Sequence, residues 1–268
     1  MATHMEQDHS AAPVLVNRAD GVLHLTLNRP DRLNALDAES VERCRDALIS
    51  VEDDHSVGAV VISGAGRAFC AGRDVETLHD VPDRRPMNPA DRAAARRHEH
   101  DRLVNGFSVV TLLRALRVPC VAALHGAVAG AGLGIALACD LRVVATNTTL
   151  VSAYGRIGLP GDWGVTWLLP RVLGDSVAKK MLLTGHRPSV ATLDTLGFAS
   201  AVVAPEDVTE EALRQAATLA AGPRIAHRHM KALMHEDGLL EHLVKEAEAT
   251  MECQESDAHR TALERFIG

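Results

Sequence analysis

The sequence predicts an α/β fold, and two observations carry this prediction. Apolar runs rich in Val, Ile and Leu alternate with longer stretches whose apolar residues recur at helical spacing. Between residues 121 and 140 an apolar run breaks at glycines that lead into an Ala- and Leu-rich segment, which is typical of a strand, a tight loop and a helix. With 268 residues the chain is long enough for one core and a helical appendage.

Strands and helices of the first half can be assigned from apolar spacing. Asp20-Gly21 separates two apolar runs and signals a hairpin. Asp37 is a good N-cap for a helix that runs to about Glu52. The predicted strands are Val14–Val16, Val22–Leu27, Val57–Ile62, Val121–Leu124 and Leu141–Ala145. Residues 1–13 carry no signal-peptide pattern and are expected to be disordered.

The segment from Thr77 to His100 is predicted to be a mobile loop that leads into a helix. Prolines and charged residues crowd Pro82–Pro89, which argues against a packed element. The segment is either a solvated insertion or a lid over a binding site. His98 and His100 lack the spacing of metal ligands, so we expect them to be surface histidines.

From Ser176 onward the pattern is mainly helical. The predicted helices are Ser176–Thr184, Glu206–Ala221, Pro223–His235 and Gly238–Ile267, with one β-type run at Ala201–Val203. Gly222-Pro223 marks the end of one helix and the first turn of the next. The shift to charged amphipathic helices near residue 206 predicts a core over residues 14–205 and a C-terminal helical subdomain over residues 206–268.

Composition limits the function. A formal net charge of -7 argues against nucleic acid or an anionic membrane as a partner, because both require a dense basic surface. No run approaches the ~18 apolar residues of a membrane span. The five cysteines are scattered without a Cys-x-x-Cys pair, and Cys70 and Cys139 lack an adjacent histidine, so we expect small core residues rather than a disulfide framework, a metal site or nucleophiles. A soluble cytoplasmic protein is expected.

Two glycine-containing loops each follow a predicted strand. The first backbone N–H groups of a helix have no intrahelical partner, so Gly130, Gly132 and Gly134 place N–H groups where negative charge can be held. Their spacing fits neither a dinucleotide nor a P-loop motif. The second loop carries Gly72 followed by Arg73. Two loops aiming one N–H each at a single oxygen form an oxyanion hole. The alternative for the first loop is close packing of a helix on a strand.

Four stretches carry a resemblance to a known family: Asn28–Leu36, Phe69–Asp74, His125–Asp140 and Gly158–Gly164. In this order and spacing the chain resembles the crotonase superfamily, the enoyl-CoA hydratases and isomerases, from about Val14 to Ile267. The resemblance implies a spiral of ββα repeats, an acyl-CoA thioester substrate, no cofactor beyond its CoA moiety, and a homotrimer or hexamer built by the C-terminal subdomain. It also implies that the N–H groups of Arg73 and Ala131 polarise the thioester carbonyl.

The resemblance further indicates which residues surround the substrate. Those expected at the CoA moiety are Arg32, Leu33, Ala71, Gly72, Asp74 and Val75. Those expected at the acyl group are Gly130, Gly134, Tyr154 and Trp163. For Trp167, core packing is an equal alternative. If the segment from Thr77 to His100 is a lid, its arginines would meet the CoA phosphates or cover the acyl pocket.

One acid stands out in the expected site. The family's hydratases use two glutamates, and the matching positions here are Gly134 and Ala153, so a two-carboxylate mechanism is not expected. Asp162 lies in an otherwise uncharged stretch, and apolar surroundings should raise its pKa toward the range useful for moving a proton. Its alternative role is an N-cap for a helix beginning at Trp163. Several family members that shift double bonds, and some aryl-CoA dehalogenases, carry an aspartate at this position.

Several functions stay open, in a definite order. Shifting an enoyl-CoA double bond needs one carboxylate, Asp162, and is the first hypothesis, which places the protein in fatty acid metabolism. Hydration with a single acid is second. Dehalogenation through an ester on Asp162 is third, because Thr111 stands where that branch carries a histidine. From a different class, the chain could be a non-catalytic CoA-ester-binding or RNA-binding member, although its charge counts against RNA. No nucleophile, histidine and acid set supports a serine peptidase.

Overall fold

The computed structural model describes residues 12–74, 88–234, 238–256, 259–261 and 263–264, and a six-stranded sheet lies at its centre. The strands are in the order β1-β2-β3-β4-β6-β8; β1 is antiparallel to β2, and the other neighbours are parallel. Strands β5 and β7 form a separate parallel pair. The bounds are β1 Val14–Ala19, β2 Val22–Leu27, β3 Ala59–Gly64, β4 Cys120–Leu124, β5 Ala127–Ala129, β6 Leu141–Ala145, β7 Thr149–Val151 and β8 Ala201–Val203.

Helices follow most of the strands, so the predicted α/β alternation is confirmed. The helices are α1 Ala38–Asp53, α2 Pro89–Ala115, α3 Gly130–Ala138, α4 Val165–Leu173, α5 Asp175–Thr184, α6 Val190–Thr195, α7 Val208–Ala220, α8 Arg224–Met234 and α9 Leu239–Gln254. The predicted cap of α1 is also confirmed, because the Asp37 side chain accepts a hydrogen bond from Ser40 N at 2.8 Å.

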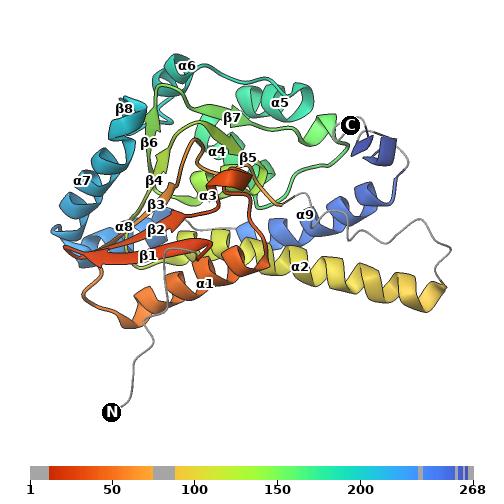
Figure 1. Ribbon diagram of the computed structural model, residues 1–268, viewed down its shortest axis with the longest axis horizontal. Coiled ribbons are helices and arrows are strands. Elements are labelled where there is room, and N and C mark those ends of the chain that lie inside the picture. Colours follow the sequence, from red (N-terminus) through yellow and green to blue (C-terminus); the bar gives the residue numbers. More distant parts are fainter. Residues whose placement is uncertain (1–11, 75–87, 235–237, 257–258, 262, 265–268) are drawn as a thin grey trace, which may run out of the picture.

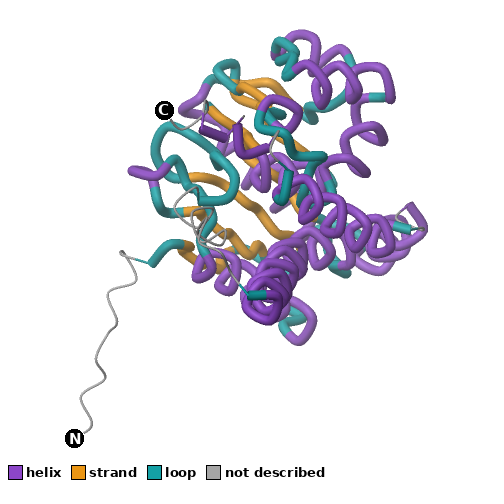
Figure 2. Tube along the Cα trace, turned by 90° about the vertical axis from the view of Figure 1, so that its right-hand side faces the viewer, coloured by secondary structure: helices purple, strands orange, loops and turns teal. Residues whose placement is uncertain are grey.

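Helices cover both faces of the sheet (Figure 1). Successive residues of a strand point to opposite faces, so alternate residues of each strand contact different helices. Val22, Val61 and Ala123 face α7, which presents alanines at every fourth position from Ala212 to Ala220. The alternate strand residues face α1, α2 and α3. Burial on both faces explains why these strands are continuous apolar runs. Figure 2 shows the strands side by side with helices packed around them.

Two predicted boundaries were wrong. Residues 75–87 lie outside the described part, but α2 begins at Pro89, so residues 89–100 are helical rather than loop. Asn88 caps this helix through Asp91 N at 2.8 Å, and a proline is tolerated in a first turn. The helix predicted over Gly238–Ile267 ends at Gln254. Residues 259–261 are again helical, and the Ser256 hydroxyl accepts a hydrogen bond from His259 N.

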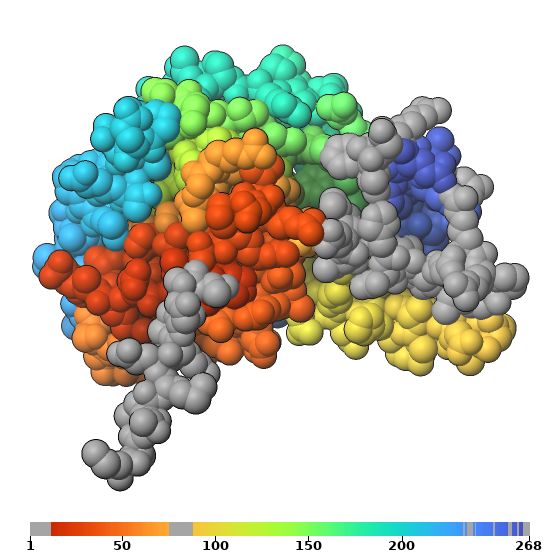
Figure 3. All heavy atoms as spheres, in the orientation of Figure 1, coloured from red at the N-terminus to blue at the C-terminus, as the bar shows by residue number. Residues whose placement is uncertain are grey.

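The helices after residue 206 pack in two places. Helix α7 covers the sheet, whereas α9 lies along α2. The apolar contact between α2 and α9 consists of Leu103, Phe107, Leu243, Ala247 and Met251. In Figure 3 the blue C-terminal residues accordingly lie beside the yellow α2, on a face that also carries the red and orange N-terminal elements. The domain boundary at residue 206 and the trimer-forming role of this region stay predictions.

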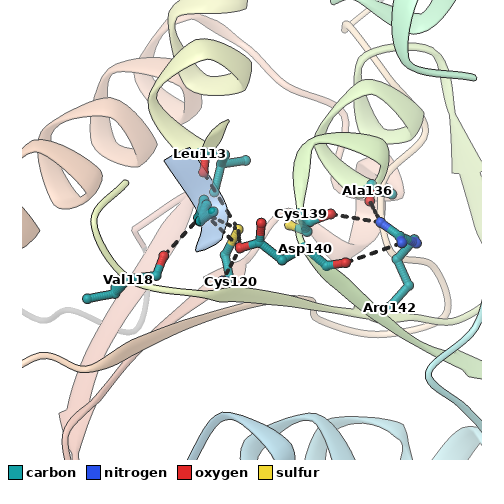
Figure 4. A network of polar contacts seen from close by, with 8 residues as sticks. Leu113, Val118, Cys120, Ala136, Cys139, Asp140 and Arg142 are labelled. Carbon is teal, nitrogen blue, oxygen red and sulfur yellow. Dashed lines mark hydrogen bonds and ion pairs between the residues drawn. The ribbon is translucent and has the colours of Figure 1, made fainter. Parts of the chain in front are cut away.

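A buried polar network joins α8 to the sheet (Figure 4). The Lys231 ammonium group donates to Asp140 Oδ2 at 2.7 Å and to the Val118 carbonyl at 3.1 Å. The same Asp140 oxygen accepts from Cys120 N at 2.8 Å, and Figure 4 shows these two residues close together. Burial lowers the pKa of Lys231, but the neighbouring Cys120 and Asp140 raise it above its ordinary value. The network therefore attaches α8 to the N-terminal ends of β4 and β6.

Candidate active site

The segment around Gly72 runs beside the segment that ends at Leu36. Leu36 N donates to the Gly72 carbonyl at 2.8 Å, and Asp74 N donates to the Leu36 carbonyl at 3.0 Å. Because alternate N–H groups of an extended segment point to opposite sides, the N–H of Arg73 points away from Leu36. The sequence places a glycine at position 72 because its φ is +104°.

Helix α3 begins at Gly130, the first of the three glycines expected at the helix start, so Ala131 lies in its first turn. A Cβ atom added to Gly72 would lie 3.5 Å from Ala131 N and 3.4 Å from Gly130 Cα, so the two backbone segments touch. Within the described ranges, neither Arg73 N–H nor Ala131 N–H donates to a protein acceptor. The two predicted loops thus come together with one unused N–H group each.

The Asp162 carboxyl group is linked to the start of α3 through Tyr154. It is 8% exposed, and Oδ1 accepts a hydrogen bond from the Tyr154 hydroxyl at 2.5 Å. A Cβ atom added to Gly130 would lie 3.9 Å from that hydroxyl oxygen, so Tyr154 links the acid to the start of α3. Asp162 and Tyr154, two residues predicted for the site, are therefore brought together next to Gly130 and Ala131.

The surroundings of Asp162 change its acidity. Burial raises its pKa to about 6, while the Arg73 charge and the Tyr154 hydrogen bond oppose the rise, and Glu246 and Glu99 add to it. The predicted direction of the shift is confirmed. The pKa of Tyr154 is raised well above its ordinary value by burial and then by the nearby Asp162 charge. Near neutral pH this site holds an ionisable carboxyl group beside a neutral phenol, which suits proton transfer.

Three charged side chains act on Asp162, namely Arg73, Glu99 and Glu246. Arg73 Nη2 lies 3.4 Å from Glu99 Oε1, and Arg102 donates to the other oxygen of Glu99. Arg73 thus supplies a backbone N–H toward the site and a side-chain cation near Asp162. Glu99 was missed by sequence reasoning, because it falls in the segment assigned to a loop.

The proposed capping role of Asp162 was wrong. Helix α4 begins at Val165 with Gly164 as its N-cap residue, and no Asp162 side-chain bond caps it. The Gly164 N–H is instead bound by Glu246 Oε2 of α9 at 2.8 Å. Sequence reasoning missed Glu246, which lies 82 residues farther along the chain than Gly164. The Asp162 side chain is consequently available for another role.

Trp163 is packed against Gly134 of α3 and Gly106 of α2. The Trp163 side chain is 1% exposed, and it lies between α3 and α2, each of which contacts it through a glycine. A Cβ atom on Gly134 of α3 would lie 2.5 Å from the Trp163 carbonyl oxygen, and one on Gly106 of α2 would lie 3.0 Å from the indole. Position 134 therefore has no room for a carboxylate side chain. Trp167 lies farther out, beneath the Arg171 guanidinium group.

The loop expected to hold CoA lies against the segment around Gly72. Ala71 N donates to the Leu33 carbonyl at 2.9 Å, and the neighbouring Arg32 is exposed. The Asp74 carboxylate is buried and pairs with Arg29 Nη2 at 2.8 Å, so it stabilises the loop from within. Val75 lies outside the described residues. CoA contact by this loop stays a prediction.

The cysteines near the site are core residues, as predicted. Cys70 and Cys139 are both buried among apolar side chains. Burial raises the pKa of the Cys70 thiol to about 12, and a hydrogen bond with Cys120, followed by burial, raises that of Cys139. In the described part of the chain, no group of three His, Cys, Asp or Glu side chains is arranged to hold a metal ion. No described helix is both long and apolar enough to cross a membrane.

Comparisons with known proteins agree with this geometry. A family model described as enoyl-CoA hydratase/isomerase matches residues 17–267. The 1,2-epoxyphenylacetyl-CoA isomerase of Escherichia coli K12 is 35% identical over 210 residues, covering 78% of this chain and 77% of that protein. The 4-chlorobenzoyl coenzyme A dehalogenase-2 of an Arthrobacter species is 30% identical over 246 residues, covering 91% and 82%. The crystal structure of an enoyl-CoA hydratase from Mycobacterium avium subsp. paratuberculosis K-10 matches with a TM-score of 0.79 and 28% identity over 96% of both chains.

The chain belongs to the enoyl-CoA hydratase/isomerase family of the crotonase superfamily, and its architecture is the crotonase fold. The resemblance carried by four short stretches is thereby confirmed. The protein is an enzyme of this family, which acts on CoA esters. Because relatives are named for isomerisation, hydration and dehalogenation, membership alone does not select the reaction.

Proposed function

We propose that this protein shifts the double bond of an enoyl-CoA thioester, with Asp162 carrying the proton. The N–H groups of Arg73 and Ala131 would bind the thioester oxygen, so that negative charge can develop there when a proton leaves the acyl chain. Asp162 would take that proton from one carbon and return it to another, which leaves the mass of the substrate unchanged. No cofactor beyond the CoA moiety is needed for these steps.

The observation that carries the proposal is the buried Asp162 carboxyl group, which Tyr154 links to the start of α3, where the two unused amides lie. The pKa of Asp162, about 6 through burial, suits a group that both accepts and donates a proton near neutral pH. A hydratase of the two-glutamate type would need acids at positions 134 and 153, where the chain has Gly134 packed on Trp163, and Ala153. One acid is enough for the isomerisation, since it acts twice.

Hydration with one acid and dehalogenation are the alternatives. The relationship to a 4-chlorobenzoyl-CoA dehalogenase supports the latter, in which Asp162 would attack the aromatic carbon, expel halide and form an ester. Hydrolysis of that ester needs a base to activate water. The Thr111 hydroxyl, at the position expected for it, donates to carbonyls of its own helix α2. This leaves isomerisation as the better supported reaction.

The test is incubation with 2-enoyl, 3-enoyl, epoxyarylacetyl and 4-halobenzoyl CoA thioesters in D₂O. Isomerisation gives a new conjugated absorbance and deuterium at the exchanged carbon. Hydration in D₂O adds 20 mass units, or 19 once the O–D group has exchanged back in H₂O, and dehalogenation releases halide. Asp162→Asn should abolish turnover and leave acyl-CoA affinity within a few-fold, whereas the exposed-site control Asp194→Asn should keep both. Near-full activity of Asp162→Asn on every accepted substrate would contradict the proposal.

We also propose that the chain assembles as a homotrimer or a dimer of trimers. Apolar side chains on α8 support this, because Ile225, Met230 and Met234 are each more than half exposed. Light scattering coupled to size-exclusion chromatography measures the mass directly, and a monomer would contradict the assignment.

A further inference from the structure

Helix α9 presents two adjacent stripes to the rest of the protein. Its apolar stripe packs on α2. Glu246, Thr250 and Gln254 form a second stripe, because residues four apart lie on one side of a helix. Glu246 is 5% exposed and Thr250 is 1% exposed. A polar stripe buried in this way must find partners inside the protein.

The partners of this stripe lie on both sides of Asp162. The Thr250 hydroxyl donates to the Gly161 carbonyl at 2.9 Å, and Glu246 Oε2 accepts from Gly164 N at 2.8 Å. Helix α9 therefore holds the residue before Asp162 and the cap residue after it. At the end of the stripe, Gln254 Nε2 donates to Glu99 Oε1 at 3.3 Å, the oxygen that also contacts Arg73.

The turn needs support, because its own backbone is in unfavourable conformations. Gly161, Trp163 and Gly164 have φ angles of +135°, +51° and +71°. For tryptophan the left-handed region is uncommon and persists only where surrounding contacts impose it. Here the surrounding contacts are the hydrogen bonds from α9 and the packing of Trp163 against Gly106 and Gly134. Asp162 is thus aimed by a turn that would not keep its shape alone.

We propose that Glu246 is a positioning residue for Asp162, which fixes the turn that carries it and places a carboxylate near its carboxyl group. This inference rests on the proposed function, in which Asp162 carries the proton. Glu246 accepts from three donors, which are Gly164 N–H, Thr166 N–H and the Thr166 hydroxyl. Its two oxygens are therefore fully used in holding the start of α4, and it does not contact the reacting atoms.

Several charged or titratable groups face this region, and they act in opposite directions. Arg73 and the Tyr154 hydroxyl favour the ionised form of Asp162, whereas Glu246 and Glu99 disfavour it. His242, one turn before Glu246, lies 3.8 Å from Glu246 Oε1 and shares Thr166 with it.

The experiment compares pH profiles of kcat/KM on a substrate that the parent enzyme converts. Glu246→Gln removes the charge while its amide can accept from Gly164 N–H and donate to the Thr166 hydroxyl. The acid limb assigned to Asp162 should move about half a unit to one unit lower. Thr250→Val is the matched control, because it removes the neighbouring hold on Gly161 without a charge. It should lower kcat several-fold and leave the limb where it is.

Glu246→Asp separates the effect of the side chain's position from the effect of its charge. It also provides a second test if Glu246→Gln does not fold. It keeps the charge on a shorter side chain, so kcat should fall several-fold with an unchanged acid limb. An unshifted limb in well-folded Glu246→Gln, or full kcat in Glu246→Asp, would overturn the inference. Infrared titration of ¹³C-labelled aspartate carboxyl groups, with Asp162→Asn identifying the band, measures the Asp162 pKa without turnover. The result therefore stands even if the proposed reaction fails.

Discussion

Asp162 is a costly residue for the fold, because its carboxylate is buried. Its pKa is about 6 in the folded protein and near 3.8 in the unfolded chain. Well below pH 3.8 both states are protonated, so the penalty is absent there. Stability is lost as pH rises from about 4 through 6, because the unfolded chain ionises first and the folded protein must then hold a buried charge.

Asp162→Asn should therefore stabilise the protein at alkaline pH. The expected gain in the free energy of unfolding is about 3 kcal/mol at pH 8, because one pKa unit corresponds to about 1.4 kcal/mol, and it should vanish below pH 4. Urea denaturation at pH 8 and pH 3 measures both values. A gain of equal size at the two pH values would mean that something other than the buried charge is responsible.

At the level of single residues, Asp162 could be predicted from the sequence, but Glu246, which supports its turn, could not. Asp162 stood out because no other charged residue lies near it in the sequence, and its burial and raised pKa follow from that apolar setting. Glu246 belongs to a helix rich in charged residues, and its neighbours Lys245 and Glu248 are exposed. Helical periodicity identifies an apolar stripe, but it gives no sign that the polar stripe beside it is buried.

Among the elements, α3 depends on its glycines. A Cβ atom on Gly132 would lie 2.6 Å from Cys70 Cβ, and one on Gly134 would meet the Trp163 carbonyl at 2.5 Å. Both alternatives considered for the glycine stretch therefore hold, because the stretch permits close packing and also starts a helix at the candidate site.

Gly134→Ala should destabilise the protein. Helix propensity alone would give a gain of about 1 kcal/mol, so a loss reports the clash with the Trp163 backbone. Overpacking of this kind costs about 1 to 3 kcal/mol. Chemical denaturation of the variant measures the balance, and any increase in stability would show that the Asp162 turn gives way without cost.

Boundaries between elements were predicted less well than the elements themselves. Prolines around residue 86 suggested a loop that extends to His100, but Asn88 and Pro89 form a favourable helix start. Helix α6 was not predicted, because its six residues contain only one buried side chain, Leu193. The central strands were predicted, since burial on both faces makes them continuous apolar runs, whereas the three-residue strands β5 and β7 were missed.

At the scale of the whole molecule, helices from distant parts of the sequence are attached by few buried polar contacts. Lys231 connects α8 to the ends of β4 and β6, more than 90 residues away in the chain. Such contacts follow from the tertiary structure and cannot be predicted from local patterns. They also make the position of α8 sensitive to a single side chain.

Lys231→Met should lower the free energy of unfolding by about 3 kcal/mol, because removal of one partner leaves the other buried charge poorly compensated. The matched control is Lys179→Met, which breaks the exposed pair with Asp175 and should change stability by less than about 1 kcal/mol. Urea denaturation compares the two variants. Equal effects would indicate that the buried network contributes nothing beyond a surface pair.

The support that α9 gives to the Asp162 turn has a consequence for synthesis of the protein. A ribosome adds about 5 to 20 residues per second, so the 82 residues from Gly164 to Glu246 take roughly 4 to 16 s. During that interval Gly72 and α3 already exist, while the Gly161 carbonyl and the Gly164 N–H still lack their α9 partners. A nascent chain or a prematurely terminated product would thus carry the two amides proposed to bind the thioester oxygen without a fixed acid, and under that proposal it would bind a thioester before it is able to convert it.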